Sequence, residues 1–179
     1  DKKRILAEGA IVIKDSQKIY DLAGIMGGEL SEVDENTKTI VLQGAIFDPI
    51  LIRRASKKLN LTTDASYRYE RGVDFEGTVA SVDLAAGLIL ETCPEAQISP
   101  IIDLKNEADT KVDIVLELEK VNKLLGLNLD LATAENYLKR LYFEVKPQDS
   151  DKLIVTVPSF RQYDVKIWQD LAEEIARIY

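Results

Sequence analysis

The stretch LTTDASYRYERGVD, residues 61–74, holds two arginines, three acidic residues, two tyrosines and several hydroxyl groups. It shows no hydrophobic period of two or of 3.6 residues, so it is not expected to cover a core. Polar loops between rigid elements are common places for binding and catalysis. A long connector that ends at Asp74, as the cap of the next helix, explains the same residues. The residues alone favour neither interpretation.

Two further stretches accompany it, LAGIMGGELSEV at residues 22–33 and VPSFRQYDVKIWQDLAEEIARIY at residues 157–179. Residues 22–33 and 61–74 resemble, in order and spacing, the B3/B4 region of the bacterial phenylalanyl-tRNA synthetase beta-chain family. Residues 157–179 are similar to the end of the B5 domain of that family. The resemblance covers nearly the whole sequence and implies an internal slice of a much longer subunit.

Composition excludes several classes of function. The formal net charge of -8 argues against general affinity for nucleic acid, DNA included, because phosphate contacts need clustered Lys and Arg. Without any histidine, the chain cannot form a Ser-His or Cys-His nucleophile. Charged residues interrupt the longest apolar runs, so no membrane-spanning segment is expected. The single Cys93 excludes an internal disulfide and favours a reducing compartment, the cytoplasm.

The first part of the chain predicts strands and helices around a glycine cluster. Residues 11–14 and 18–22 alternate as a hairpin, and the second strand runs into Gly24, Gly27 and Gly28. A tight turn explains one or two of these glycines, while three at a strand end favour a pocket wall. Further elements are expected as a strand at 39–45, a helix from Asp48 to Asn60, a broad and largely buried helix at 74–93, and a strand at 97–102.

One side of the helix expected at 48–60 is basic. Its apolar side carries Ile52, Ala55, Ser56 and Leu59. The basic side, together with two arginines of the 61–74 stretch, forms the main basic cluster of an acidic chain: Arg53, Arg54, Lys57, Lys58, Arg68 and Arg71. A solvated helix face explains these residues. Contact with a tRNA backbone is the alternative interpretation.

A polar break at residues 106–110 marks the expected linker between domains 1–105 and 111–179. The second domain is expected to contain strands at 112–116, 142–146 and 153–157 and helices at 119–125 and 133–141. The predicted fold class is α/β (α+β). By resemblance, it consists of a partial B3/B4 mixed sheet with packed helices, the C-terminal half of that domain, followed by a small winged-helix-like B5 domain.

The resemblance implies a role in phenylalanine–tRNA ligase, the enzyme that joins phenylalanine to its tRNA with ATP as substrate and Mg²⁺ as cofactor. It also implies a heterotetramer of two alpha and two beta subunits, with the activation site in the alpha subunit. The expected partners are therefore the alpha subunit and tRNA(Phe), without DNA or a membrane. This slice would supply scaffold, subunit contacts and part of an editing pocket, and would carry no catalytic residue of its own.

In the resembled family, the B3/B4 module hydrolyses tyrosine wrongly attached to tRNA(Phe). Gly24, Gly27, Thr63 and Ala65 match positions that shape that pocket, and Gln43 stands where the family has the Glu that reads the tyrosine hydroxyl. The family's editing histidine lies upstream of this slice, so the chain by itself is expected not to edit.

Four carboxylates form a second candidate site. Asp170, Glu173 and Glu174 have the i, i+3, i+4 spacing of one helical face, and Asp164 lies just before them. Carboxylates that lie close together repel unless they are solvated or share a hard cation. The residues alone favour a solvated face. By resemblance, these four positions match family residues assigned to magnesium shared with the alpha subunit.

Two rival functions stay open. A free-standing aminoacyl-tRNA editing hydrolase would need the other half of the pocket upstream. An editing-deficient structural module that binds RNA or protein is favoured if Gln43 means that editing has been lost. The sequence does not choose between retained and lost editing.

Overall fold

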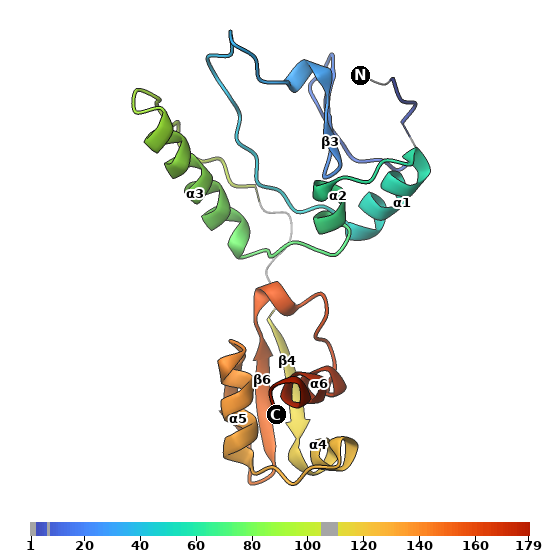
Figure 1. Ribbon diagram of the computed structural model, residues 1–179, viewed down its shortest axis with the longest axis vertical. Helices are drawn as coiled ribbons and strands as arrows, with labels where there is room; N and C mark the ends of the chain where they lie inside the picture. Colours follow the sequence, from blue (N-terminus) through green and yellow to red (C-terminus); the bar gives the residue numbers. More distant parts are fainter. Residues whose placement is uncertain (1–2, 7, 105–110) are drawn as a thin grey trace. The chain divides into compact units, whose positions relative to one another are not determined.

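The computed structural model describes residues 3–6, 8–104 and 111–179 (Figure 1). The chain forms two compact units, Asp1–Pro100 and Ile101–Tyr179, each with its own small sheet and apolar core. The linker predicted at residues 106–110 lies outside the described residues, so the predicted domain limits stay a prediction.

In the first unit, a three-stranded antiparallel sheet runs in the order β1 (Val12–Lys14), β2 (Ile19–Leu22) and β3 (Met26–Gly27). The turn between β1 and β2 is held by the carboxylate of Asp15, which accepts from the backbone amides of Gln17 and Lys18 at 2.7 Å each. These bonds confirm the predicted hairpin. A 3-10 turn, η1 (Glu29–Ser31), follows β3.

Three helices follow in this unit: α1 (Pro49–Leu59), α2 (Asp64–Tyr69) and α3 (Gly77–Thr92). The Asp48 carboxylate caps α1 by accepting from two of its first amides, and Asn60 ends it in the left-handed conformation with φ 45°. The predicted helix is therefore confirmed at both ends. The core is small: Ile25, Ile52 and Ala55 are buried, and Phe47 and Tyr69 pack against them with ring centroids 5.2 Å apart.

Several predictions for this unit are wrong. Residues 39–45 and 97–102 form no strand, because within the described residues no strand pairs with either segment. Helix α3 starts at Gly77 with Glu76 at the N-cap, so Asp74 does not cap it. None of the residues of α3 is buried, although the helix is apolar nearly all round. A pattern of apolar residues predicts which side of a helix can be buried, but burial also requires a packing partner.

In the second unit, the antiparallel sheet has the order β4 (Val112–Glu117), β6 (Lys152–Val157), β5 (Glu144–Pro147). Helices α4 (Leu118–Leu125), α5 (Leu131–Arg140) and α6 (Trp168–Ile178) pack around one core (Figure 1). Its fully buried large side chains are Leu116, Val121, Leu138, Leu153, Val155, Val157, Val165, Leu171 and Ile175.

The strands and helices predicted for this unit are confirmed to within a few residues. Gly126 ends α4 at φ 69°, a conformation that glycine adopts without strain. The predicted α/β class is confirmed by helices combined with two small antiparallel sheets, and the winged-helix arrangement stays a prediction. No helix among the described residues is long and apolar enough to cross a membrane.

Candidate functional site

One threonine joins the glycine turn after β2 to the start of α2. The Thr63 hydroxyl donates to the backbone carbonyl of Ile25 at 2.6 Å and accepts from the amide of Ser66 at 3.0 Å. The fully buried Ser66 hydroxyl in turn accepts from the Thr63 amide at 2.8 Å. This reciprocal capping box satisfies amides that a helix start leaves without partners. It fixes α2 against the turn.

Gly24 and Gly27, which the resemblance assigns to the pocket, differ in what surrounds them. Gly24 has φ +65°, and a Cβ built on it would lie 3.0 Å from Ile52, 3.1 Å from Phe47 and 3.2 Å from Tyr69. Glycine is required there because the backbone is left-handed and three core side chains approach it closely. A Cβ on Gly27 would meet its nearest neighbours only at 3.5 and 3.6 Å, which is ordinary contact.

The structure therefore brings Thr63 to the turn that contains Gly24, as the sequence predicts for one pocket. Ala65 is half-buried in the first turn of α2. Gln43 is exposed in an irregular segment, and its side chain makes no hydrogen bond to another residue that the structure describes. The five-residue editing pocket stays a prediction.

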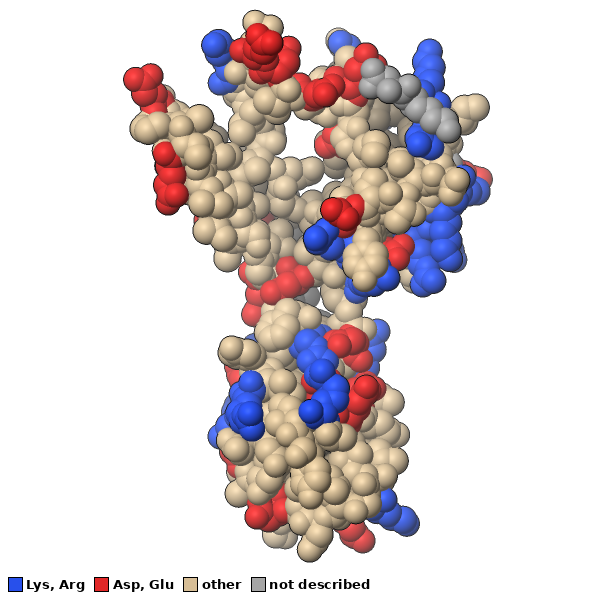
Figure 2. Space-filling view, viewed as in Figure 1, with Lys and Arg blue, Asp and Glu red and all other residues tan. Residues whose placement is uncertain are grey.

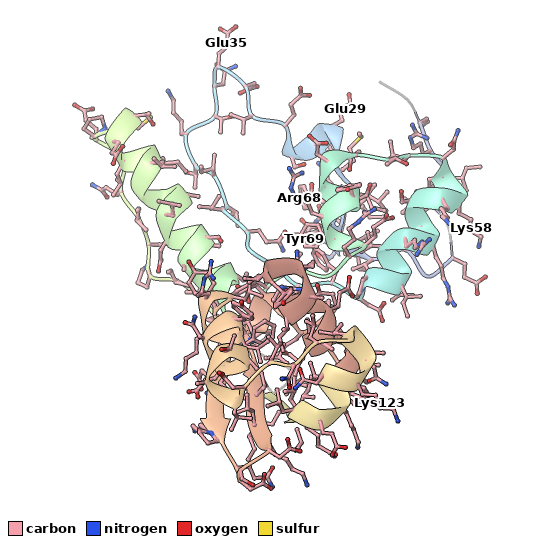
Figure 3. The ribbon with its side chains drawn as sticks, turned by 60° about the horizontal axis from the view of Figure 1, so that its bottom comes forward. Glu29, Glu35, Lys58, Arg68, Tyr69 and Lys123 are labelled. Atoms are coloured by element: carbon pink, nitrogen blue, oxygen red, sulfur yellow. The ribbon has the colours of Figure 1, made fainter. Side chains whose placement is uncertain are left out.

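Sequence reasoning missed Ser66, which is the buried partner of Thr63. The signal was present, because a hydroxyl residue followed three positions later by a second polar side chain is the pattern of a capping box. The stretch 61–74 is therefore not only a connector: it contains α2 and supplies Tyr69 to the core (Figure 3).

Replacing Thr63 by valine should lower the stability of the first unit by about 1–2 kcal/mol, because the isosteric side chain loses both hydroxyl hydrogen bonds. Amide hydrogen exchange of α2 and of the turn around Ile25 measures the effect. Thr63→Ser keeps the hydroxyl and should exchange nearly as slowly as the wild type. Equal exchange in the valine and serine variants would show that the capping box does not hold the turn.

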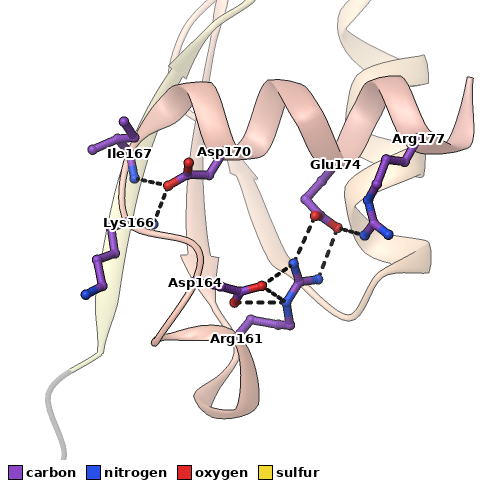
Figure 4. A network of polar contacts seen from close by, with 7 residues as sticks. All are labelled: Arg161, Asp164, Lys166, Ile167, Asp170, Glu174 and Arg177. Carbon is purple, nitrogen blue, oxygen red and sulfur yellow. Dashed lines mark hydrogen bonds and ion pairs between the residues drawn. The ribbon is translucent and has the colours of Figure 1, made fainter. Parts of the chain in front are cut away.

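In the second unit, an arginine lies between two of the four predicted metal ligands, Asp164 and Glu174 (Figure 4). Arg161, in the 3-10 turn η2 (Ser159–Arg161), forms a fork to Glu174 with N–O distances of 2.9 and 3.0 Å. It also pairs with Asp164 at 2.8 Å. Arg177 pairs with Glu174 from the next turn of α6. Glu174 is only 5% exposed, so its charge is compensated inside the protein.

The other two carboxylates have different surroundings. One oxygen of Asp170 accepts from the backbone amides of Lys166 and Ile167 at 2.8 and 3.0 Å, at the start of α6. A carboxylate there is favoured by the free amides and by the helix dipole. Glu173 is exposed. A surface hollow beside α6 is lined by this set together with both arginines.

Electrostatics keeps the buried pair ionised. Hydrogen bonds from Arg161, and then from Arg177, outweigh burial and hold the pKa of Glu174 below its ordinary value of 4.5. The same contacts, with Glu174 contributing most and Asp164 next, raise the pKa of Arg161 above its already high value. Both groups therefore carry full charge throughout the neutral range.

This arrangement does not fit a magnesium ion as it stands. Among the described residues, no group of three or more Asp, Glu, His or Cys side chains could hold a metal. A cation at Asp164 and Glu174 would have to displace Arg161, which already forms ion pairs with both. The magnesium site stays a prediction. Sequence reasoning missed Arg161 as the counter-charge because it lies 13 positions before Glu174.

Comparison with known proteins places both units. The family model described as "B3/4 domain" matches residues 1–94, and that described as "tRNA synthetase B5 domain" matches residues 114–179. The chain therefore belongs to the B3/4 domain family, and its second part matches the B5 domain of tRNA synthetases.

The individual relatives are more specific. The chain is 40% identical over 178 residues to the phenylalanine–tRNA ligase beta subunit of Protochlamydia amoebophila (strain UWE25), covering 99% of the chain and 22% of the relative. It is 38% identical over 179 residues to the subunit of the same name from Staphylococcus haemolyticus (strain JCSC1435), covering 100% and 22%. The chain thus spans about a fifth of the length of these relatives. Its resemblance to the beta chain of this synthetase is confirmed.

Proposed function

We propose that this chain works as part of the beta subunit of phenylalanine–tRNA ligase, the enzyme that charges tRNA(Phe) with phenylalanine at the expense of ATP. The supporting observation is the similarity over the whole chain, with the two family models in the same order as the two units. The partners in this proposal are an alpha subunit, which carries the activation site, and tRNA(Phe). The assembly contains two copies of each subunit.

The two units have separate tasks in this proposal. The first contributes one side of a pocket that hydrolyses tyrosine from tRNA(Phe), supported by the contact between Thr63 and the turn around Gly24. The second contributes scaffold and alpha-subunit contacts. Magnesium serves the ATP-dependent step of the intact enzyme. We assign it no ligands beside α6, because Arg161 already binds oxygens of Asp164 and Glu174.

A chimera tests this proposal. Residues 1–179 replace the 179 matching residues of the Staphylococcus haemolyticus beta subunit, and the protein is produced with its alpha subunit. Phenylalanylation of tRNA(Phe) within about tenfold of the parent is expected, about 1.4 kcal/mol of activation free energy. A chimera that assembles with the alpha subunit but does not charge tRNA would overturn the proposal.

Replacing Gln43 by glutamate in the chimera tests the editing part. A carboxylate accepts a hydrogen bond from a phenol about twice as strongly as a neutral amide does. If Gln43 reads the tyrosine hydroxyl, the preference for hydrolysing Tyr-tRNA(Phe) over Phe-tRNA(Phe) should rise by about 5–30-fold, or about 1–2 kcal/mol. An unchanged ratio with active editing means that Gln43 does not read the hydroxyl.

A structural module without editing is the second candidate. The exposed position of Gln43, with no hydrogen bond to another described residue, favours it. In that case neither the chimera nor its Gln43→Glu variant removes tyrosine from tRNA(Phe), while charging persists. The free-standing hydrolase, which needs the upstream half of the pocket, would be supported by deacylation of Tyr-tRNA(Phe) by the chimeric beta subunit produced without its alpha subunit.

A further inference from the structure

The outer side of α1 carries four basic residues, Arg53, Arg54, Lys57 and Lys58, here called the α1 basic face. At 3.6 residues per turn these positions fall within an arc of about 140°. All four side chains are exposed, while the other side of the helix buries Ile52, Ala55 and Ser56. Figure 2 shows basic side chains gathered over α1, and Figure 3 shows Lys58 on the outer side of this helix.

Helix stability does not explain this face. No member of the α1 basic face is in an ion pair with a residue that the structure describes, and α1 itself contains no acidic residue. Arg53 with Lys57 and Arg54 with Lys58 are like charges one turn apart, an arrangement that destabilises a helix. The helix dipole favours Lys57 and Lys58 in the last turn, but the two arginines lie earlier.

Arg68 of α2 and Arg71 just beyond this helix, grouped with this face in the sequence, have other partners. Arg71 lies over the ring of Tyr67 at 3.6 Å, pairs with Glu70 at 2.9 Å and donates to the Tyr67 carbonyl. Arg68 donates to the carbonyl of Asp64 at 2.9 Å. Of these six basic residues, Arg71 is the one with a carboxylate partner among the described residues, and four of the other five lie on α1.

We propose that the α1 basic face binds the phosphate backbone of tRNA. This inference rests on the proposed function, which brings a tRNA to the chain. With a formal net charge of -8, the chain as a whole repels a polyanion, so attraction has to come from a local cluster. Arginine presents a fork that matches phosphate oxygens, and lysine adds point charges. Such contacts hold and position the RNA without reading its sequence.

Salt dependence of binding measures the contacts directly. A variant with Arg53, Arg54, Lys57 and Lys58 all changed to glutamine removes the face and keeps good helix formers. The matched control changes four exposed lysines of the second unit, Lys120, Lys123, Lys139 and Lys146, to glutamine. Both variants have the same net charge, so long-range electrostatics is equal between them. Binding of uncharged tRNA(Phe) to the 179-residue chain is measured by filter retention from low to moderate KCl.

The slope of log affinity against log salt should fall in magnitude by roughly 3 in the face variant, because each phosphate contact contributes about 0.7–0.9. The control should keep the wild-type slope. Equal slopes in all three proteins, or no tRNA binding by the wild-type chain, would overturn the inference. The inference would also be overturned if the face variant no longer captured the alpha subunit but still bound tRNA. The α1 basic face would then bind an acidic surface of that subunit.

The chimeric ligase separates this inference from the proposed function. In the chimera, the face variant should raise the KM for tRNA(Phe) and leave phenylalanine-dependent pyrophosphate exchange unchanged. A chimera that charges tRNA with the same KM in wild type and face variant refutes the α1 contact alone. A wild-type chimera that assembles but does not charge tRNA refutes the proposed function.

Discussion

Replacing Arg161 by methionine is expected to lower the free energy of unfolding of the second unit by about 2–4 kcal/mol. Glu174 has a side chain only 6% exposed and would keep a single partner, Arg177, which is itself 54% exposed. Removing one partner of a buried ion pair is costly because the remaining charge stays buried without full compensation. Methionine keeps a long unbranched side chain, so the loss reflects the charge more than the packing.

Trp168 provides the measurement. It is the only tryptophan of the chain, and it lies at the start of α6 against the core of the second unit. Its fluorescence during urea denaturation therefore follows this unit without a signal from the first. The midpoint should fall with little change in slope, as expected when stability changes and the exposed surface does not.

Two other cations of the same unit serve as controls. Lys139 pairs with Glu135 at the surface, where its side chain is 55% exposed, so Lys139→Met should cost less than about 0.5 kcal/mol. Arg177→Met should fall between the two. A loss for Arg161→Met no larger than for Lys139→Met would show that the pair with Glu174 does not stabilise the unit.

The difference between wild type and Arg161→Met should also depend on pH. Because the pKa of Glu174 is lowered in the folded protein, its contribution is fully present above its unfolded value of 4.5. That contribution is lost as the pH falls through the lower folded pKa. The two proteins should therefore differ by a constant amount near neutral pH and converge in acid below pH 4.5.

Magnesium chloride distinguishes the arginine from a metal ion as the counter-charge. The wild-type chain should unfold at the same urea concentration with and without magnesium, because Arg161 already holds the oxygens of Asp164 and Glu174. Weak binding is expected at most, since Mg²⁺ demands octahedral oxygen ligands and keeps several of its waters. A clear rise in wild-type stability would contradict the assignment of Arg161 to this role.

Sequence predicted the features of this chain that are encoded locally. The cap at Asp48, the stop at Gly126 and the hairpin turn at Asp15 each depend on residues within a few positions of one another. The apolar side of α6 is encoded locally too, because Leu171, Ala172 and Ile175 repeat at helical spacing, and all three are fully buried. Such features can be predicted because the residues that cause them lie within a few positions of one another in the sequence.

Features that need a distant partner were not predictable in the same way. The pattern of α3 indicated burial, yet burial needs a second surface, and none of the residues of α3 is buried. The spacing of Asp170, Glu173 and Glu174 indicated one helical face, and only the family resemblance implied a shared cation. The spacing could not show that Arg161 would reach Glu174 across 13 positions, or that Asp170 would bond to amides at the start of α6. The charge balance of a folded site depends on contacts between residues far apart in the sequence, and a local pattern does not predict these contacts.

Adjacent glycines of the first unit give the sharpest contrast between packing and function. Replacing Gly28 by alanine should cost about 2–3 kcal/mol, because the new Cβ would lie 2.3 Å from the backbone carbonyl oxygen of Tyr20. That oxygen accepts from the Gly28 amide at 2.7 Å, so relief of the clash breaks the link between β2 and η1. The φ of -95° is ordinary, and the penalty comes from the close approach alone.

Gly27→Ala is the matched control and also the functional test. Its Cβ meets Asp21 and Ser31 only at ordinary contact distances, and alanine restricts the unfolded chain, so stability should change by less than about 0.5 kcal/mol. Amide exchange of β2 and β3 should therefore speed up in Gly28→Ala and not in Gly27→Ala. If the turn lines the proposed pocket, the chimera carrying Gly27→Ala should lose hydrolysis of Tyr-tRNA(Phe) while its exchange rates stay unchanged. Unchanged hydrolysis in an editing-active chimera would place Gly27 outside the pocket, leaving the turn with a purely structural role.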